Sequence, residues 1–239
     1  MKTRDALGNV SKPSEPAQVV TDASRFELLV NAFDNPRDFL ADGTAGSVWD
    51  GLVGKSPNSS ADVIAVKDNA LRIQSTNTSW DGGGKRGPFL YKLVKGDFVA
   101  EVKIADFPGL AKHQVQGNHD AGLMVRLPTT DDKENLVQIG FFPAYDVGNM
   151  WTSLGPHGRP QRGNRLAWDA HRWLQIERRG EAFHLRTSPD GKRWFEMPGS
   201  PVVRGEFANQ PLQLGFYHAT YGNITGAVVF EDFRMAVRE

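Results

Sequence analysis

Residues 173–194, WLQIERRGEAFHLRTSPDGKRW, decide the fold class of this chain. Apolar and polar residues alternate with a period of two on both sides of Gly180, which is typical of half-buried β-strands. The apolar positions of this alternation are Leu174, Ile176, Phe183 and Leu185. Residues 188–191, SPDG, supply the Pro and Gly that a tight turn favours. The stretch therefore predicts three short strands joined by two tight turns, and an all-β protein.

The polar positions of the same stretch form a second pattern. If its first two strands pair as a hairpin, Glu177 lies opposite His184, and Gln175 lies opposite Arg186. Such pairs commonly decorate the solvent face of a sheet, and a lone Glu and His define no mechanism. We interpret this set as a structural ion-pair cluster.

Further runs of strand length are spread along the chain. They are residues 28–33, 63–66, 70–74, 89–93, 98–104, 121–126, 136–142, 212–217 and 227–235. No amphipathic helix of convincing length and no fixed repeat interrupts them. Residues 1–25 are polar and Pro-bearing, so we expect a flexible N-terminal arm. We expect residues 26–239 to form a single antiparallel jelly-roll sandwich domain, because sandwiches of this length are common as one domain.

Composition excludes several classes of partner. The chain of 239 residues balances 28 Lys and Arg against 28 Asp and Glu, so no net charge draws it to nucleic acid. No segment approaches the roughly 18 apolar residues of a membrane span. Without cysteine there is neither a disulfide nor a thiolate metal site. The compartment is left open, and a secreted or periplasmic location is favoured if a leader has been removed.

Several short sequence motifs occur one after another along the chain. They are GPFLYK from Gly87, AGLMVR from Ala121, WLQIER from Trp173, SPDGKRW from Ser188 and FEDF from Phe230. In these motifs the chain resembles the concanavalin A-like lectin/glucanase superfamily, above all the C-terminal sandwich domain of family 43 glycoside hydrolases and its stand-alone bacterial relatives. The resemblance spans about residues 26–237. It implies a jelly-roll of two curved sheets, a glycan on the concave face, and often a structural calcium.

The catalytic strand of the superfamily's glucanases is missing. Those enzymes carry Glu-x-Asp-x-Glu or Glu-x-Asp-x-x-Glu, which places carboxylates on one face of a strand. Here Glu101 and Asp106 fall on opposite faces of their run, and Glu231 and Asp232 are adjacent and so also opposed. The hydrolytic mechanism of the superfamily is therefore not carried over.

Alternate residues of a strand point to opposite faces of the sheet, and this inward or outward parity predicts a shared polar surface for three strands. Burial of the apolar residues in each strand turns Arg126, Gln138 and Tyr217 outward. Arg, Gln and Tyr resemble in type the residues with which jelly-roll polysaccharide lyases handle a uronate. The Gln-Ile-His of those lyases is replaced here by Gln138-Ile-Gly140. His218 has buried parity and reads as a core histidine.

Loop aromatics add to this surface. Trp80 and Trp151 are placed by the sequence in loops, where a flat ring excludes water from a sugar face. We expect carbohydrate recognition in a groove formed by Arg126, Gln138, Tyr217, Trp80 and Trp151. The alternative is an enzyme, a polysaccharide lyase or glycoside hydrolase, on the same scaffold, and a partner-binding module is a third reading. On the groove hypothesis Arg126→Ala and Trp151→Ala lose glycan and keep the fold.

Other polar groups were weighed as metal sites. The resemblance places the end of the first strand beside the last strand, which predicts a structural calcium held by Asp34 and Asp232. His119 and Asp120 lie in a polar stretch without ligand spacing, and we interpret them as a solvated loop. Glu134 falls in what we interpret as an exposed hairpin turn.

Overall fold

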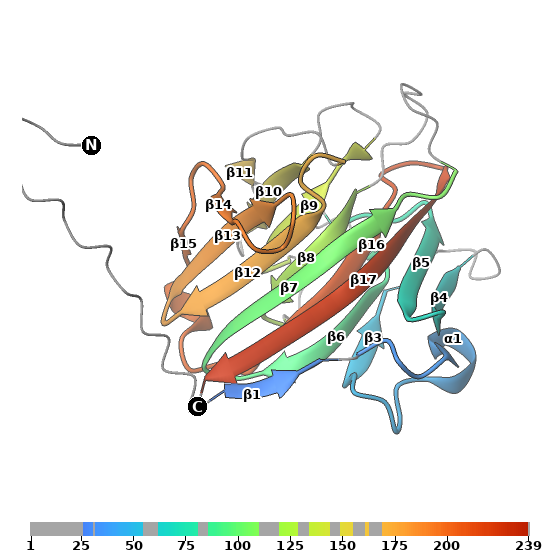
Figure 1. The fold of residues 1–239 in the computed structure, drawn as a ribbon, viewed down its shortest axis with the longest axis horizontal. Helices are drawn as coiled ribbons and strands as arrows, with labels where there is room; N and C mark the ends of the chain where they lie inside the picture. The colour runs from blue at the N-terminus through green and yellow to red at the C-terminus, as the bar shows by residue number, and fades with distance from the viewer. Residues whose placement is uncertain are drawn as a thin grey trace, which may run out of the picture.

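The computed structural model describes residues 26–30, 32–54, 62–80, 86–109, 120–128, 134–143, 149–154, 161–162 and 169–238. Two antiparallel β-sheets pack face to face within these residues, and Figure 1 shows the larger sheet in front of the smaller one. The predicted all-β class and two-sheet antiparallel sandwich are confirmed. In the described part of the chain, no helix is long and apolar enough to cross a membrane.

The larger sheet contains ten strands. Its main path is β14 (Phe195–Glu196), β13 (Ala182–Ser188), β12 (Trp173–Arg179), β7 (Asp97–Asp106), β17 (Thr225–Arg238), β5 (Ala70–Thr76), β4 (Val63–Lys67) and β2 (Arg37–Asp38). β1 (Phe26–Leu29) pairs with β17, and β15 (Val202–Val203) pairs with β13. The helix α1 (Phe39–Asp42) follows β2, and the short 3-10 helix η4 (Gly205–Phe207) follows β15.

The smaller sheet contains seven strands. Their order is β11 (Gln161–Arg162), β10 (Asn149–Leu154), β9 (Leu136–Phe141), β8 (Asp120–Arg126), β16 (Leu212–Ala219), β6 (Phe89–Val94) and β3 (Gly51–Val53). The sequence predicts that Trp151 lies in a loop, and β10 corrects that prediction. The run Asn149–Leu154 lacks a clean alternation, so its pairing with β9 is invisible to a periodicity argument.

A single apolar core lies between the sheets. Each strand sends alternate residues inward, so Leu123 and Val125 of β8 join the core and Met124 between them lies on the other face. Aromatic rings fill one end of this core, where Trp49 meets Phe216 edge-on at a centroid distance of 5.2 Å. The inward faces of β8, β9 and β16 are the ones predicted from the alternation of apolar residues in the sequence.

The hairpin of β12 and β13 has the predicted register. Glu177 lies opposite His184, and Gln175 lies opposite Arg186. The histidine takes a different partner, because its Nδ1 lies 2.9 Å from Oε1 of Glu196 on β14. Arg186 donates to both Glu177 and Glu196. The set is a structural network on the outer face of the ten-stranded sheet.

Candidate functional site

A second cluster of buried side chains covers the outer face of the seven-stranded sheet. It contains Trp80, Phe89, Met124, Leu136, Tyr217 and Ala219, none of which belongs to the core between the sheets. The strand register places Gly215, Met124 and Gln138 in one row across the face, and Gln213, Arg126 and Leu136 in the next. Arg126, Gln138 and Tyr217 therefore share the face that their parity predicts.

Arg126 organises one half of this face. Its Nε lies 2.6 Å from Oε2 of Glu134, and its Nη1 donates to Oε1 of Gln213 at 2.8 Å. The same guanidinium lies 5.9 Å from the ring centroid of Trp80, within the range of a cation–π contact. Arg86 pairs with the second oxygen of Glu134. Both oxygens of this carboxylate are therefore held by guanidinium groups.

Asp120 organises the other half. Tyr217 Oη donates to Oδ1 of Asp120 at 2.7 Å, and Gln138 Nε2 donates to Oδ2 at 3.3 Å. Burial raises the pKa of Tyr217 well above its usual value, and the negative charge of Asp120 raises it further. The tyrosine is therefore a neutral hydrogen-bond donor at physiological pH.

Two buried polar atoms on this face of the sheet have no hydrogen-bond partner. They are Oε1 of Gln138 and Nε1 of Trp80, and both are buried. An unpaired buried polar atom costs roughly 1–3 kcal/mol, so native proteins rarely leave one without a reason. An acceptor and a donor on one face are thus free for a ligand that offers the complementary groups.

The face is closed rather than an open groove. The exposed fractions are 4% for Arg126, 4% for Gln138, 1% for Tyr217 and 2% for Trp80. Partly exposed residues border the cluster. They are Arg86, Tyr91, Phe142 and Tyr221. The rings of Phe142 and Tyr221 stack with a centroid distance of 5.6 Å and an interplanar angle of 18°, which gives this border a flat apolar platform.

Trp151 stands apart from the other predicted residues. It lies in β10, not in a loop, and its backbone pairs with Ile139, whose side chain belongs to the core between the sheets. The position that pairs with Gln138 is Thr152. The side chain of Trp151 lies outside the described part of the structure.

Sequence reasoning missed the two carboxylates of the face. Asp120 is the first residue of β8, and Glu134 is 2% exposed instead of lying in a solvated turn. Continuing the outward parity of Met124 back through Gly122 would have placed Asp120 on the same face. Nothing in the sequence around Glu134 signals its burial, because its partners Arg86 and Arg126 are 48 and 8 residues away.

His218 has the buried role expected from its parity. It is fully buried, and its Nδ1 lies 2.7 Å from Oγ of Ser75. That contact joins β16 to β5 of the opposite sheet. The residue belongs to the core and not to the outer face.

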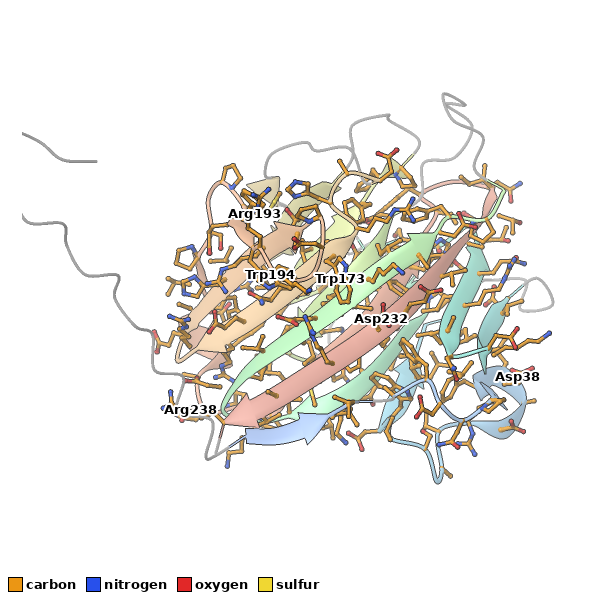
Figure 2. All side chains as sticks on the ribbon, viewed as in Figure 1. Asp38, Trp173, Arg193, Trp194, Asp232 and Arg238 are labelled. Carbon is orange, nitrogen blue, oxygen red and sulfur yellow. The ribbon has the colours of Figure 1, made fainter. Side chains whose placement is uncertain are left out.

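Asp34 and Asp232 lie on segments that the fold brings together. β1 pairs with β17, and the rings of Phe33 and Phe233 are 6.3 Å apart. Both carboxylates are exposed, and Nζ of Lys103 lies 3.9 Å from Oδ2 of Asp232, which Figure 2 shows midway along β17. Among the described residues, no group of three or more His, Cys, Asp or Glu could hold a metal. The juxtaposition favours the predicted calcium, whereas the ammonium group of Lys103 opposes it.

Gly140 shows why the lyase histidine has no place here. A Cβ on Gly140 would collide with the hydroxyl of Tyr217 and with the backbone carbonyl of Ala121. The space that a histidine side chain would need at position 140 is occupied by the Tyr217–Asp120 hydrogen bond.

Comparisons with known proteins agree with this architecture. No family model and no curated protein sequence matches the chain. A functionally unknown protein from Saccharomyces cerevisiae matches in structure with a TM-score of 0.56 and 15% identity, over 80% of this chain and 97% of that one. A legume lectin-like domain from Entamoeba histolytica matches with a TM-score of 0.50 and 13% identity, over 79% and 90% of the two chains.

A glycoside hydrolase matches over the whole chain. The GH43 protein BlXynB from Bacillus licheniformis has a TM-score of 0.55 and 14% identity, over 100% of this chain and 46% of its own. The chain thus spans about half the length of that enzyme. At these identities the comparisons establish the fold alone, a sandwich of two antiparallel β-sheets.

Proposed function

We propose that this protein recognises a carbohydrate at the outer face of the seven-stranded sheet. The observation that carries the proposal is the unpaired acceptor of Gln138 and the unpaired donor of Trp80, both buried on one face. A sugar ring offers hydroxyl groups, which donate and accept, and apolar C–H faces. The stacked rings of Phe142 and Tyr221 supply the matching apolar platform at the border. The fold shared with a lectin-like domain and a GH43 protein supports the same class of ligand.

The border and the buried cluster have different roles in this proposal. Arg86, whose side chain is 33% exposed, and the Phe142–Tyr221 pair meet the ligand first. Gln138 and Trp80 are reached only when the face becomes accessible. Arg126 and Tyr217 act as positioning residues, because their donors are already engaged by Glu134, Gln213 and Asp120.

Binding is favoured over catalysis by the state of the reactive groups. A lyase needs a tyrosine or histidine that gives up its proton, but the raised pKa of Tyr217 disfavours the phenolate. A retaining or inverting glycosidase needs a carboxylic acid free to protonate a leaving group. Both oxygens of Glu134 are occupied by guanidinium groups, and both oxygens of Asp120 accept hydrogen bonds.

A glycan array followed by calorimetry tests the proposal. Phe142→Ala removes half of the aromatic platform, and a stacked aromatic contact is worth about 1–3 kcal/mol, so we expect the affinity to fall roughly fivefold to a hundredfold. Phe195→Ala is the matched control, because Phe195 is 40% exposed on the other sheet. Failure of the wild type to bind any glycan, or an equal loss in both variants, overturns the proposal.

A second measurement separates binder from enzyme. The wild-type protein is incubated with a panel of neutral and uronate polysaccharides, and new reducing ends and unsaturated ends are quantified. We expect neither to rise above a sample without protein. A rise in either, abolished by Gln138→Leu, would establish catalysis at this face in place of binding alone.

A further inference from the structure

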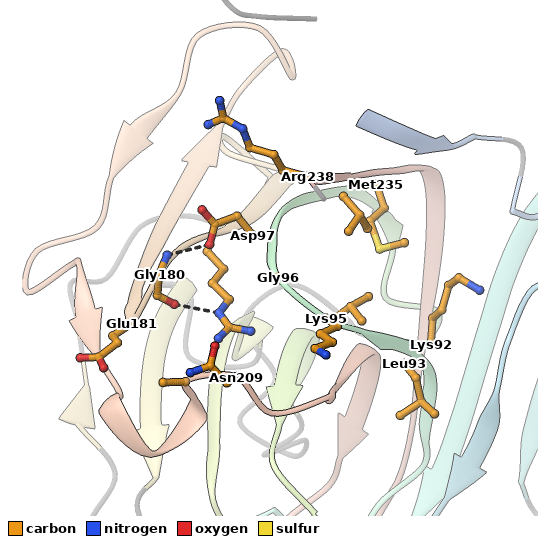
Figure 3. A pocket seen from close by; sticks show the side chains of 14 residues that line it. Lys92, Leu93, Lys95, Gly96, Asp97, Gly180, Glu181, Asn209, Met235 and Arg238 are labelled. Carbon is orange, nitrogen blue, oxygen red and sulfur yellow. Dashed lines mark hydrogen bonds between the residues drawn. The ribbon is translucent and has the colours of Figure 1, made fainter. Parts of the chain in front are cut away.

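A pocket of about 730 Å³ lies at one end of the sandwich. It is lined by the turn between β6 and β7, the turn between β12 and β13, the segment before β16, and the last residues of β17. Figure 3 shows this arrangement, with Lys95, Gly180, Asn209 and Arg238 around the opening. The pocket shares no lining residue with the outer-face cluster, so it is a separate site.

Arg178 is the buried charge of this pocket. Its side chain is 4% exposed, its Nε donates to the carbonyl of Gly180 at 2.8 Å, and its Nη2 donates to the carbonyl of Phe207 at 2.9 Å. Nη1 is buried and has no hydrogen-bond partner. These contacts fix the guanidinium in place and leave part of its donor capacity unused.

No carboxylate of the described residues forms an ion pair with Arg178. Asp97 is near enough to favour its charge, but Oδ1 of Asp97 accepts a hydrogen bond from the backbone N–H of Gly180 at 2.7 Å. Burial lowers the pKa of Arg178, which reflects the unfavourable desolvation of this cation, and Asp97 offsets part of that effect. A buried guanidinium without an ionic partner is costly and rare, because charges inside proteins are normally paired.

The rest of the lining is positive and partly apolar. Lys95 and Arg238 join Arg178, against Asp97 and Glu181, whereas the ammonium group of the lining residue Lys92 pairs with Asp50 and donates to the carbonyl of Val48. Lys95 is exposed, and no described residue pairs with its ammonium group. The apolar lining residues are Leu93, Val94, Ala208, Met235 and Val237. The volume lies within the usual range for small-molecule sites, about 300–1,000 Å³.

We propose that this pocket binds a small organic anion, a carboxylate on a carbon skeleton of about monosaccharide size. The carboxylate pairs with Arg178 and Lys95, since guanidinium and ammonium groups are the natural partners of an oxyanion in a desolvated site. The carbon skeleton rests on the apolar lining. Inorganic phosphate fits less well, because an inorganic ion leaves that lining without a contact.

Calorimetry with sodium glucuronate tests this site. Glucose is the neutral match of the same size, and acetate and inorganic phosphate are the anions without the sugar skeleton. We expect glucuronate to bind the wild-type protein more tightly than all three. Lys95→Glu reverses an exposed charge at the mouth of the pocket and should weaken glucuronate binding about tenfold.

Lys67→Glu is the matched control for Lys95→Glu. Lys67 is an exposed lysine on β4, which Figure 1 places at the opposite side of the molecule from the C-terminal end of β17. It should leave the affinity unchanged. Arg178→Lys keeps the charge but loses the fixed fork, and it should weaken binding by a similar factor if circular dichroism shows a folded protein.

The assignment is overturned by any of three results. They are no glucuronate binding to the wild type, equal affinity for glucuronate and phosphate, and an affinity that Lys95→Glu leaves unchanged. Because Lys95→Glu alters only an exposed side chain, the test stands even if Arg178→Lys does not fold. None of these three results bears on glycan recognition at the outer face, which uses other residues.

Discussion

Tyr217 and Asp120 meet across the outer face of the seven-stranded sheet, with Oη of the tyrosine 2.7 Å from Oδ1 of the aspartate. Gly140 on the neighbouring strand leaves the space in which this bond forms. The phenol is fully desolvated, and the carboxylate is 1% exposed. The pair therefore ties β16 to β8 at the centre of the proposed carbohydrate site.

Removal of this hydrogen bond should cost stability. Tyr217→Phe removes the hydrogen bond that Oδ1 of Asp120 accepts from the phenol, and a hydrogen bond to a charged group contributes about 1.5–3 kcal/mol. Urea denaturation measures the loss. Tyr91→Phe is the control, because the Tyr91 hydroxyl has no hydrogen-bond partner among the described residues, and it should change the free energy of unfolding by less than about 0.5 kcal/mol. Equal effects of the two variants would contradict the role of the bond.

The same tyrosine predicts a loss of stability at alkaline pH. The pKa of Tyr217 in the folded protein lies well above the usual value for tyrosine, about 10, so the folded state keeps its proton while the unfolded chain ionises. The stabilisation is complete below about pH 10 and is lost as the pH rises through and beyond that value. Thermal melts between pH 8 and pH 11 measure the slope. Tyr217→Phe should flatten it, and an unchanged slope would contradict the assignment.

The ion-pair network around Arg186 predicts how the stability of the fold changes at acid pH. Burial alone would raise the pKa of Glu177, but hydrogen bonds from Arg179 and Arg186 bring it below its usual value. The pKa of Glu196 is lowered in the same way by Ser200, Arg186 and His184. Lowered carboxylate pKa values stabilise the fold above about pH 4.5, and that stability is lost as the pH falls through the folded values.

A pH titration of stability tests this network. Arg186→Met should reduce the slope of unfolding free energy against pH between about pH 5 and pH 3. Arg72→Met is the control, because the side chain of Arg72 is exposed and donates to Gln74, not to a carboxylate. A slope that falls equally in both variants would mean that other carboxylates dominate.

Arg126→Ala should destabilise the protein and not simply abolish binding. The sequence predicted a variant that keeps its fold, but Arg126 is buried and pairs with the buried carboxylate of Glu134. Removal of one partner of a buried ion pair costs about 3–5 kcal/mol when the other charge is left uncompensated, and we expect a smaller loss here because Glu134 keeps its pair with Arg86. Chemical denaturation measures this loss. Phe142→Ala, at the border of the face, is therefore the better probe of ligand binding.

The proposed calcium at Asp34 and Asp232 has a direct test. If the site exists, calcium in hundredfold excess over its Kd stabilises the folded state by about 2.7 kcal/mol, and the melting temperature rises. Asp232→Asn should remove the rise. Asp68→Asn, an exposed aspartate that also has a positive φ, should preserve it. A melting temperature that is insensitive to both calcium and chelator would exclude the site.

The sequence predicted the faces of the strands better than their accessibility. Parity correctly placed Arg126, Gln138 and Tyr217 together, because the alternation along a strand is a local property of the chain. It could not show that these residues are buried, since Arg126, for example, is held by Glu134 and Gln213, which lie on other segments of the chain. Exposure is decided by tertiary contacts that no single strand encodes.

Weak alternation and long-range contacts explain the remaining gaps. β10 escaped prediction because Asn149–Leu154 is stabilised as a strand by pairing with β9, not by its own pattern. The pocket around Arg178 is formed by four separate segments of the chain, so no local sequence motif predicts it. Register was recovered only in the hairpin of β12 and β13, where a short turn fixes it.

The position of β17 constrains the order in which the protein assembles. This strand of 14 residues, Thr225–Arg238, pairs with β7 on one side and with β5 and β1 on the other. During synthesis, β5 and β7 emerge from the ribosome long before the strand that joins them, and each waits with an unpaired edge. The nascent chain therefore cannot complete its larger sheet during translation until residues 225–238 clear the exit tunnel, and chaperones have an interval in which to shield it.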